Sequence, residues 1–229
     1  MASDGSDEHG MKKVTLFRHK GSESEGNSSR ASSRSGTVKD RSQIDPSLSE
    51  HGWRELETIK KYYETHPVPE IVITSPLKRS LQTSTVFKSL NTKIVAEELC
   101  RSSLTKCLSS KRSPISEIKL EFDFVDFSNC YYDEDNLYQT ENRSLWKSKV
   151  LAVRERANRF LTYLEELPHK EITVISHSSF IRNLLAQVVG LNDNHDVVID
   201  DVVSIFYNPD RGWELLESAI IVKLKPDNS

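Results

Sequence analysis

Hydrophobic positions follow two different periods along this chain. Short runs rich in Val, Ile and Leu, bounded by turn residues, predict buried strands at 13–17, 70–74, 93–96 and 171–176. Between them, apolar residues recur every three or four positions and predict helices at 49–65, 77–90, 147–167 and 178–190. A terminal hairpin is predicted by β-rich runs on either side of a glycine-containing loop, at 202–207 and 213–224. This alternation predicts an α/β fold, a three-layer sandwich whose mainly parallel central sheet carries helices on both faces.

Three segments follow neither period. Residues 1–10 are polar and acidic and are predicted to be a disordered tail. The serine-rich stretch 21–46 is long for a loop in a compact domain, and we expect it to be either a flexible loop or a lid. Residues 97–146 are predicted to be an insertion of loops with one or two short helices, whose charged runs are most simply solvated surface. Residues 11–225 are then expected to form a single domain.

Composition narrows the class of protein. The 229 residues carry a formal net charge of −3, with a pI near 6.2, so no overall attraction to nucleic acid or to an anionic membrane is expected. No run approaches the ~18 apolar residues that span a bilayer, and the N-terminus lacks the apolar core of a signal peptide. These features favour a cytoplasmic protein, with the nucleus left open. Disulfides and a zinc site are disfavoured by an odd number of widely spaced cysteines, Cys100, Cys107 and Cys130.

Polar side chains suited to an anion follow three of the predicted strands. In chain order they are Arg18, His19, Ser75, Arg79, His177 and Ser178. Because the carboxyl ends of parallel strands in an open α/β sheet share one edge, we expect these groups to converge. A guanidinium donates to two phosphate oxygens at once, and helix N-termini favour anions, so the convergence predicts a phosphate site. Two histidines could instead hold a metal, but two permanent cations and no clear carboxylate partner disfavour a divalent ion, so no metal is expected.

Two serines at these strand ends also match signals for the start of a helix. Ser75 followed by Pro76 predicts a serine N-cap with proline at the first helical position. Ser178 is likewise placed to cap the helix that follows it. Arg79 would then lie in the first turn of its helix, beside backbone N–H groups that favour anions.

Three stretches resemble the signatures of a known family. They match in order and spacing the three motifs of the histidine phosphatase (phosphoglycerate mutase-like) superfamily: Phe17-Arg18-His19, Ser75-Pro76-Leu77-Lys78-Arg79-Ser80-Leu81-Gln82-Thr83 and Ile175-Ser176-His177-Ser178. The run 48–52 looks like the entry into that family's first helix, and the resemblance spans about residues 14–190. The stretches 98–112 and 125–128 resemble the eukaryotic phosphoglycerate mutase-like branch more than the glycolytic enzymes.

This resemblance implies a cofactor-free reaction on a small phosphorylated substrate. His19 would be the nucleophile that becomes phosphohistidine, and a neutral imidazole is competent for this role because an unperturbed histidine titrates at about 6.5. The phosphoryl group would be held by the residues that match the family's phosphate ligands: Arg18, Arg79, His177, Ser178 and Asn27. Phosphoryl transfer asks mainly for positioning and preorganised positive charge, which such a set supplies.

The chain departs from the family pattern in three places. Lys20 follows His19 where the family usually has glycine, and Asn27 comes two residues later than the usual asparagine. The family's general acid is a glutamate in a Leu-x-Glu-Arg-like context, and Arg101 falls at that position here. Glu98, or Glu97 beside it, could reach the site and donate the proton, or a group of the substrate could do so.

Three functions remain open from the sequence. The leading interpretation is a metal-independent phosphatase that hydrolyses phosphate monoesters through a phosphohistidine on His19. The alternative is a pseudophosphatase, an interaction or scaffold protein that binds phosphate with little turnover, and a phosphoglycerate mutase proper is less favoured. Basic residues of the poorly patterned segments, Arg30, Arg34, Lys106 and Arg112, could favour a polyanionic substrate or could be solvated loop charges. The terminal hairpin could supply an edge strand to a homodimer or could finish the sheet.

Overall fold

A seven-stranded sheet forms the centre of the protein, in a computed structural model that describes residues 10–19, 21, 44–102, 108–141, 146–190, 195–199, 202–215 and 220–224. The strands stand in the order β4-β3-β2-β5-β1-β7-β8. Their bounds are β1 Lys12–Arg18, β2 Ile71–Thr74, β3 Lys93–Glu97, β4 Asp126–Asn129, β5 Glu171–Ser176, β7 Val202–Asn208 and β8 Gly212–Leu215. The five strands from β4 to β1 run parallel, while β7 and β8 complete one edge in antiparallel register.

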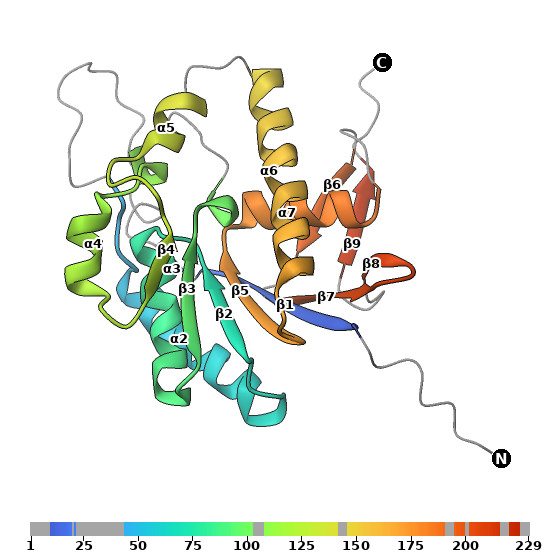
Figure 1. Ribbon diagram of the computed structural model, residues 1–229, viewed down its shortest axis with the longest axis horizontal. Coiled ribbons are helices and arrows are strands. Elements are labelled where there is room, and N and C mark those ends of the chain that lie inside the picture. Colours follow the sequence, from blue (N-terminus) through green and yellow to red (C-terminus); the bar gives the residue numbers. More distant parts are fainter. Residues whose placement is uncertain are drawn as a thin grey trace.

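Helices cover both faces of this sheet, as predicted (Figure 1). The α-helices are α2 Glu50–Thr65, α3 Lys78–Ser84, α4 Ile115–Glu121, α5 Asn136–Glu141, α6 Trp146–Glu166 and α7 Ser178–Val188. Short 3-10 helices are η2 Thr85–Leu90, η3 Glu98–Cys100 and η4 Leu108–Ser110. No helix in the part of the chain that the structure describes is long and apolar enough to cross a membrane.

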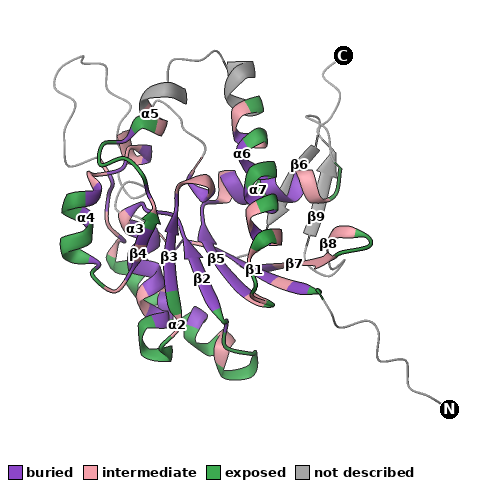
Figure 2. Ribbon diagram, viewed as in Figure 1, coloured by how far each residue is buried: buried purple, intermediate pink, exposed green. Residues whose placement is uncertain are grey.

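Two hydrophobic cores lie on opposite faces of the sheet because successive strand residues point to opposite sides. Val14 and Leu16 of β1 join the core under α6 and α7, and Phe17 joins the core under α2 and α3. The predicted stripe of α6 is buried at four positions, Val153, Ala157, Phe160 and Leu164. In Figure 2 the strands are largely buried, while the outward side of α6 is exposed. The three-layer α/β architecture predicted from the sequence is therefore confirmed.

Several predicted elements differ from the observed ones. The insertion 97–146 holds a strand, β4, which extends the sheet at its edge beside β3. The run 213–224 is two strands, because β8 ends at Leu215 and β9 (Ile220–Leu224) pairs with β6 (His195–Ile199) in a separate two-stranded sheet. The predicted helix 77–90 is an α-helix only as far as Ser84 and continues as a 3-10 helix. The tail 1–9 and most of the loop 21–46 lie outside the described residues.

Neither serine predicted to cap a helix does so. The N-cap of α3 is Leu77, and the N-cap of α7 is His177, directly before Ser178. The Ser75 hydroxyl lies 2.8 Å from Nε2 of His177, so a tertiary contact occupies the group that was expected to cap α3. By contrast, Ser49 caps α2 and accepts a hydrogen bond from the backbone N–H of Gly52 at 3.1 Å.

Candidate active site

The three predicted strand ends meet at one edge of the sheet. His19 follows β1, Ser75 follows β2 and His177 follows β5, and these strands are neighbours in the order β2-β5-β1. Backbone hydrogen bonds fix the corners against each other, since His19 N donates to the Ser176 carbonyl at 2.8 Å and Ser75 N donates to the Ile175 carbonyl at 3.0 Å. The convergence expected from the sequence is present.

Arg79 bridges the two histidines from the first turn of α3. Its Nε lies 3.2 Å from Nε2 of His19, and its Nη2 lies 3.2 Å from Nδ1 of His177. The two imidazole rings stand edge to face with centroids 4.8 Å apart. All three side chains are buried, with 6% of His19, 5% of Arg79 and 2% of His177 exposed. One guanidinium and two imidazoles therefore share a small enclosed volume.

These contacts determine which ring nitrogens carry lone pairs. A guanidinium can only donate, so Nε2 of His19 and Nδ1 of His177 both accept from Arg79. Neutral His177 then carries its proton on Nε2, which donates to the Ser75 hydroxyl at 2.8 Å. The Nε2 lone pair of His19 faces the guanidinium, where a phosphate oxygen would be attracted.

Electrostatics keep His177 neutral. Burial, followed by the positive charge of Arg79 and the proximity of the second histidine, His19, lowers the pKa of His177 well below its ordinary value. A neutral ring can both accept from Arg79 and donate to Ser75, whereas an imidazolium could only donate. The site thus holds one permanent cation at its centre rather than several that would repel one another.

Two further groups hold Arg79 and the start of its helix in place, and no sequence pattern marks either of them. The Ser109 carbonyl in η4 accepts from Nη1 of Arg79 at 2.9 Å. Asp45 is 2% exposed and accepts from the backbone N–H groups of Lys78 (2.8 Å) and Ser113 (2.9 Å), which fixes the start of α3. Burial raises the pKa of the Asp45 carboxyl. Both contacts join segments more than 25 residues apart, so no local pattern marks them.

The other predicted phosphate ligands lie at the edge of this cluster or outside the described residues. Arg18 is the last residue of β1, half-buried and in register with Ser176 of β5. Ser178 is the half-buried first residue of α7. Asn27 and Lys20 lie outside the described residues. The structure therefore brings together His19, Arg79 and His177, with Arg18 and Ser178 adjacent in sequence to two of them.

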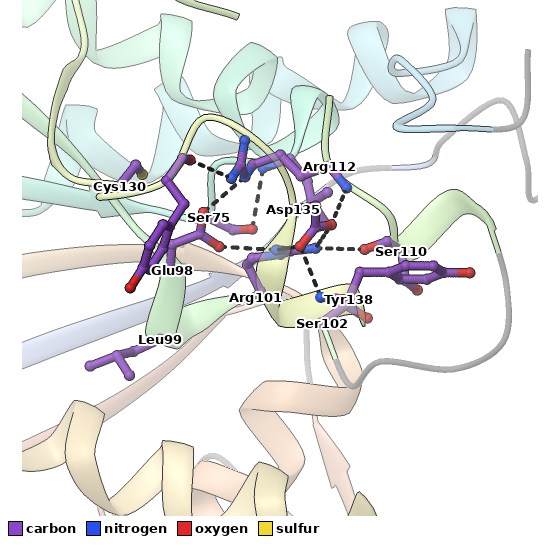
Figure 3. A network of polar contacts seen from close by, with 12 residues as sticks. Ser75, Glu98, Leu99, Arg101, Ser102, Ser110, Arg112, Cys130, Asp135 and Tyr138 are labelled. Carbon is purple, nitrogen blue, oxygen red and sulfur yellow. Dashed lines mark hydrogen bonds and ion pairs between the residues drawn. The ribbon is translucent and has the colours of Figure 1, made fainter. Parts of the chain in front are cut away.

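Glu98, the predicted acid, makes two ion pairs with arginines. Its Oε2 accepts from Nη1 of Arg101 at 3.0 Å, and its Oε1 lies 2.8 Å from Nε of Arg112 (Figure 3). Glu97 is buried and accepts from the backbone N–H of Leu99 and from the side chain of Asn129, and burial raises its pKa. Both glutamates line a cavity of about 790 Å³ next to α6, and none of the three central site residues lines it.

Arg112 is not a solvated loop charge. It is 2% exposed, and its guanidinium donates to a ring of backbone carbonyls, those of Ser113, Tyr132, Asp133 and Glu134. Because these bonds and the Glu98 ion pair occupy the guanidinium, Arg112 fastens two loops together and is not presented to a substrate. Arg30, Arg34 and Lys106 lie outside the described residues.

Metal-binding geometry is not found where the chain is described: no group of three or more His, Cys, Asp or Glu side chains there could hold an ion. The donor set at the centre of the site is two imidazoles bridged by a guanidinium, which suits an anion better than a cation.

Comparisons with known proteins match this chain to a family and to two plant proteins. The model of the histidine phosphatase superfamily (branch 1) matches residues 15–102. The chain is 28% identical over 197 residues to phosphoglycerate mutase-like protein 1 of Arabidopsis thaliana, covering 72% of this chain and 68% of that protein. It is 25% identical over 179 residues to a second phosphoglycerate mutase-like protein of the same plant, covering 62% and 63%. The chain spans about two thirds of the length of these relatives.

Solved structures share the fold. Mycobacterial hydrolase 1 superposes with a TM-score of 0.56 at 14% identity, covering 90% of this chain and 97% of that one. A phosphoserine phosphatase from Entamoeba histolytica superposes with a TM-score of 0.52 at 14% identity, covering 91% and 96%. The match to the histidine phosphatase superfamily, branch 1, extends over residues 15–102, which is less than half of the chain. The chain's distant homology to the plant phosphoglycerate mutase-like proteins confirms the branch expected from the sequence.

Proposed function

We propose that the protein hydrolyses phosphate monoesters through a phosphohistidine on His19. The observation that carries this proposal is the lone pair of His19 Nε2, which accepts from the same guanidinium that also holds His177. A phosphoryl group that enters here would take over the N–H groups of Arg79 and leave Nε2 facing phosphorus. The nucleophile and the positive charge then meet without rearrangement of the three strand ends.

The reaction proceeds in two displacements. In the first, His19 Nε2 forms a bond to phosphorus while the ester P–O bond breaks, and the departing oxygen takes a proton. In the second, water attacks the phosphohistidine, the N–P bond breaks, and inorganic phosphate leaves with His19 restored. Arg79, with Arg18, offsets the charge on the equatorial oxygens, and the N-terminus of α7 at Ser178 offers backbone N–H groups. His177, whose single N–H donates to Ser75, supports the site by accepting from Arg79.

Glu98 is the proposed proton donor to the departing oxygen. In the structure its carboxyl is held by two ion pairs, with Arg101 and Arg112, which must break before it can donate. Aryl phosphates, whose phenolate leaves without a proton, should therefore react faster than alkyl phosphates. Glu98→Gln should lower alkyl phosphate hydrolysis by about 10² to 10⁴ and leave aryl phosphate hydrolysis nearly unchanged. Equal losses on both substrates would remove Glu98 from the acid role.

A second candidate function is a phosphate-binding protein with little turnover. The ion pairs of Glu98 with Arg101 and Arg112 favour this alternative. A carboxyl engaged by two guanidiniums is a poor proton donor, while the phosphate-binding groups would remain complete. Such a protein would bind oxyanions as tightly as the enzyme but would turn over neither class of ester.

Hydrolysis of a generic aryl phosphate by the wild type and by His19→Ala separates the two candidates. We expect turnover by the wild type and none by the alanine variant. His51→Ala is the matched control, because His51 is an exposed histidine of α2 whose Nδ1 lies 3.3 Å from Glu55 Oε2, and this variant should behave as the wild type. Wild-type protein without turnover would favour the binding protein, and turnover by His19→Ala would exclude the phosphohistidine.

A further inference from the structure

A fully buried ion pair lies behind η4. Arg101 donates to Asp135 through two parallel bonds, Nη1 to Oδ1 at 2.6 Å and Nη2 to Oδ2 at 2.7 Å, and neither side chain is exposed (Figure 3). The Asp135 carboxylate also accepts from the backbone N–H groups of Arg112 at 2.7 Å and Tyr138 at 2.9 Å. These bonds lower the pKa of Asp135 despite its burial, and they offset part of the desolvation cost of burying the pair.

The same guanidinium reaches the turn that contacts the candidate active site. Nη2 of Arg101 donates to the Ser110 carbonyl at 2.8 Å. The preceding carbonyl, that of Ser109, accepts from Nη1 of Arg79 at 2.9 Å. Two guanidiniums therefore donate to consecutive peptide carbonyls of η4. Arg79 of the candidate active site binds the first, and Arg101 of the buried ion pair binds the second.

Charge balance explains why Asp135 is needed in this arrangement. Arg101 and Arg79 approach neighbouring carbonyls, and unpaired guanidiniums there would repel each other. Asp135, together with Glu98 on the same guanidinium, neutralises Arg101, so the group can hold η4 without adding a second net positive charge beside His177. Arg101 nevertheless contributes to the low pKa of His177, which places its charge within reach of the site.

We propose that Arg101 and Asp135 form a positioning unit that aligns Arg79 for oxyanion binding through the Ser109–Ser110 peptide of η4. This rests on the proposed function, in which Arg79 binds the phosphoryl group. Neither Arg101 nor Asp135 touches the substrate. Their effect passes through two backbone carbonyls, and it must therefore vanish when Arg79 is absent.

Fastening of the loops alone does not account for this contact. Arg112 already joins the segment 112–113 to residues 132–134 through three carbonyls, those of Tyr132, Asp133 and Glu134, so these loops are held together independently of Arg101. Arg101 instead contacts η4 itself, where its bond to the Ser110 carbonyl lies next to the bond from Arg79 to the Ser109 carbonyl. A displacement of a ligand group by about 1 Å can cost 10²-fold in activity, so even a small shift of Arg79 would be measurable.

A double-mutant cycle read by tungstate binding tests the proposal. Titration calorimetry on the full chain would compare the wild type, Asp135→Asn, Arg79→Ala and the double variant. We expect Asp135→Asn to weaken tungstate binding about 10-fold when Arg79 is present and by less than about 2-fold when it is absent. Unchanged affinity in Asp135→Asn, or the same loss in both backgrounds, would overturn the proposal.

Two further variants keep the test decisive. Arg101→Lys retains the charge but not the paired donors, so it should reproduce the Arg79-dependent loss if Asp135→Asn fails to fold, and tight binding by it would overturn the proposal. Lys12→Met is the matched control: Lys12 is buried and donates to the carbonyls of Leu164 and Glu165 at the opposite end of β1 from His19. It should lose stability and keep its tungstate affinity. Wild-type protein that binds no tungstate would instead exclude the proposed function itself.

Discussion

Acidification should destabilise the fold through His177, whose pKa is lowered by burial and by Arg79. The unfolded chain takes up a proton at this histidine as the pH falls through about 6.5, while the folded state resists it. The neutral ring therefore contributes to the free energy of unfolding above pH 6.5. Below pH 6.5 this contribution falls by up to about 1.4 kcal/mol for each pH unit, until the pH reaches the pKa of His177 in the folded state. Between pH 7.5 and 5.5 the expected loss is about 1.4 kcal/mol.

Other groups change the pH dependence of stability in the opposite direction, and their effect must be separated from that of His177. Burial raises the pKa values of Asp45 and Glu97, so protonation of these carboxyls favours the folded state as the pH falls. A single pH profile would mix the two effects. The difference between the wild type and His177→Gln isolates the histidine, because both carboxyls are present in each protein.

Urea unfolding at pH 7.5 and 5.5, followed by tryptophan fluorescence, measures this difference. The wild type should lose about 1.4 kcal/mol more than His177→Gln over this interval, whatever the stability of the variant at pH 7.5. For a chain of this length, that corresponds to a fall of roughly 3–6 °C in Tm. Equal losses in the two proteins would show that His177 is not held neutral, and the assignment of its Nδ1 as an acceptor from Arg79 would be wrong.

Three other substitutions test separate parts of the structure. Arg79→Ala removes charge-assisted hydrogen bonds and should weaken competitive inhibition by phosphate or vanadate about 10-fold to 100-fold, whereas unchanged inhibition constants would place Arg79 outside the pocket. Gly52→Ala would put a Cβ 2.1 Å from the Gly21 carbonyl oxygen and should cost about 1–3 kcal/mol in urea unfolding, and a neutral effect would refute that contact. Phe160→Ala, at a fully buried position of α6, should cost about 3–5 kcal/mol in the same assay, and a loss below 1 kcal/mol would contradict its place in the core.

The sequence predicted the layers of the fold and the centre of the site because both depend on local patterns. Buried strands and amphipathic helices show their periods within about ten residues. His19 and His177 directly follow strands, and Arg79 lies in the first turn of the helix after β2. The weak strand β4 was missed for the same reason, since Phe127 is its one buried residue and no alternation marks it. β6 was missed as well, and it pairs with β9 rather than with the main sheet.

Polar contacts between distant segments could not be predicted. Ser75 has the spacing of an N-cap, but its hydroxyl contacts His177, 102 residues away. Arg101 and Asp135 lie 34 residues apart in segments whose charges resemble solvated surface, although both are buried. A sequence pattern shows that a charged residue is present, whereas only the fold shows which opposite charge lies beside it.

The central claim is a covalent phosphoryl group on His19, and trapping it is the most direct test. The protein would be mixed with an aryl phosphate, quenched in base, digested and mapped by mass spectrometry. We predict one base-stable, acid-labile phosphoryl group on the peptide that contains His19, and none in His19→Ala. A phosphoryl group on another residue, or ester hydrolysis that persists in His19→Ala, would contradict the account.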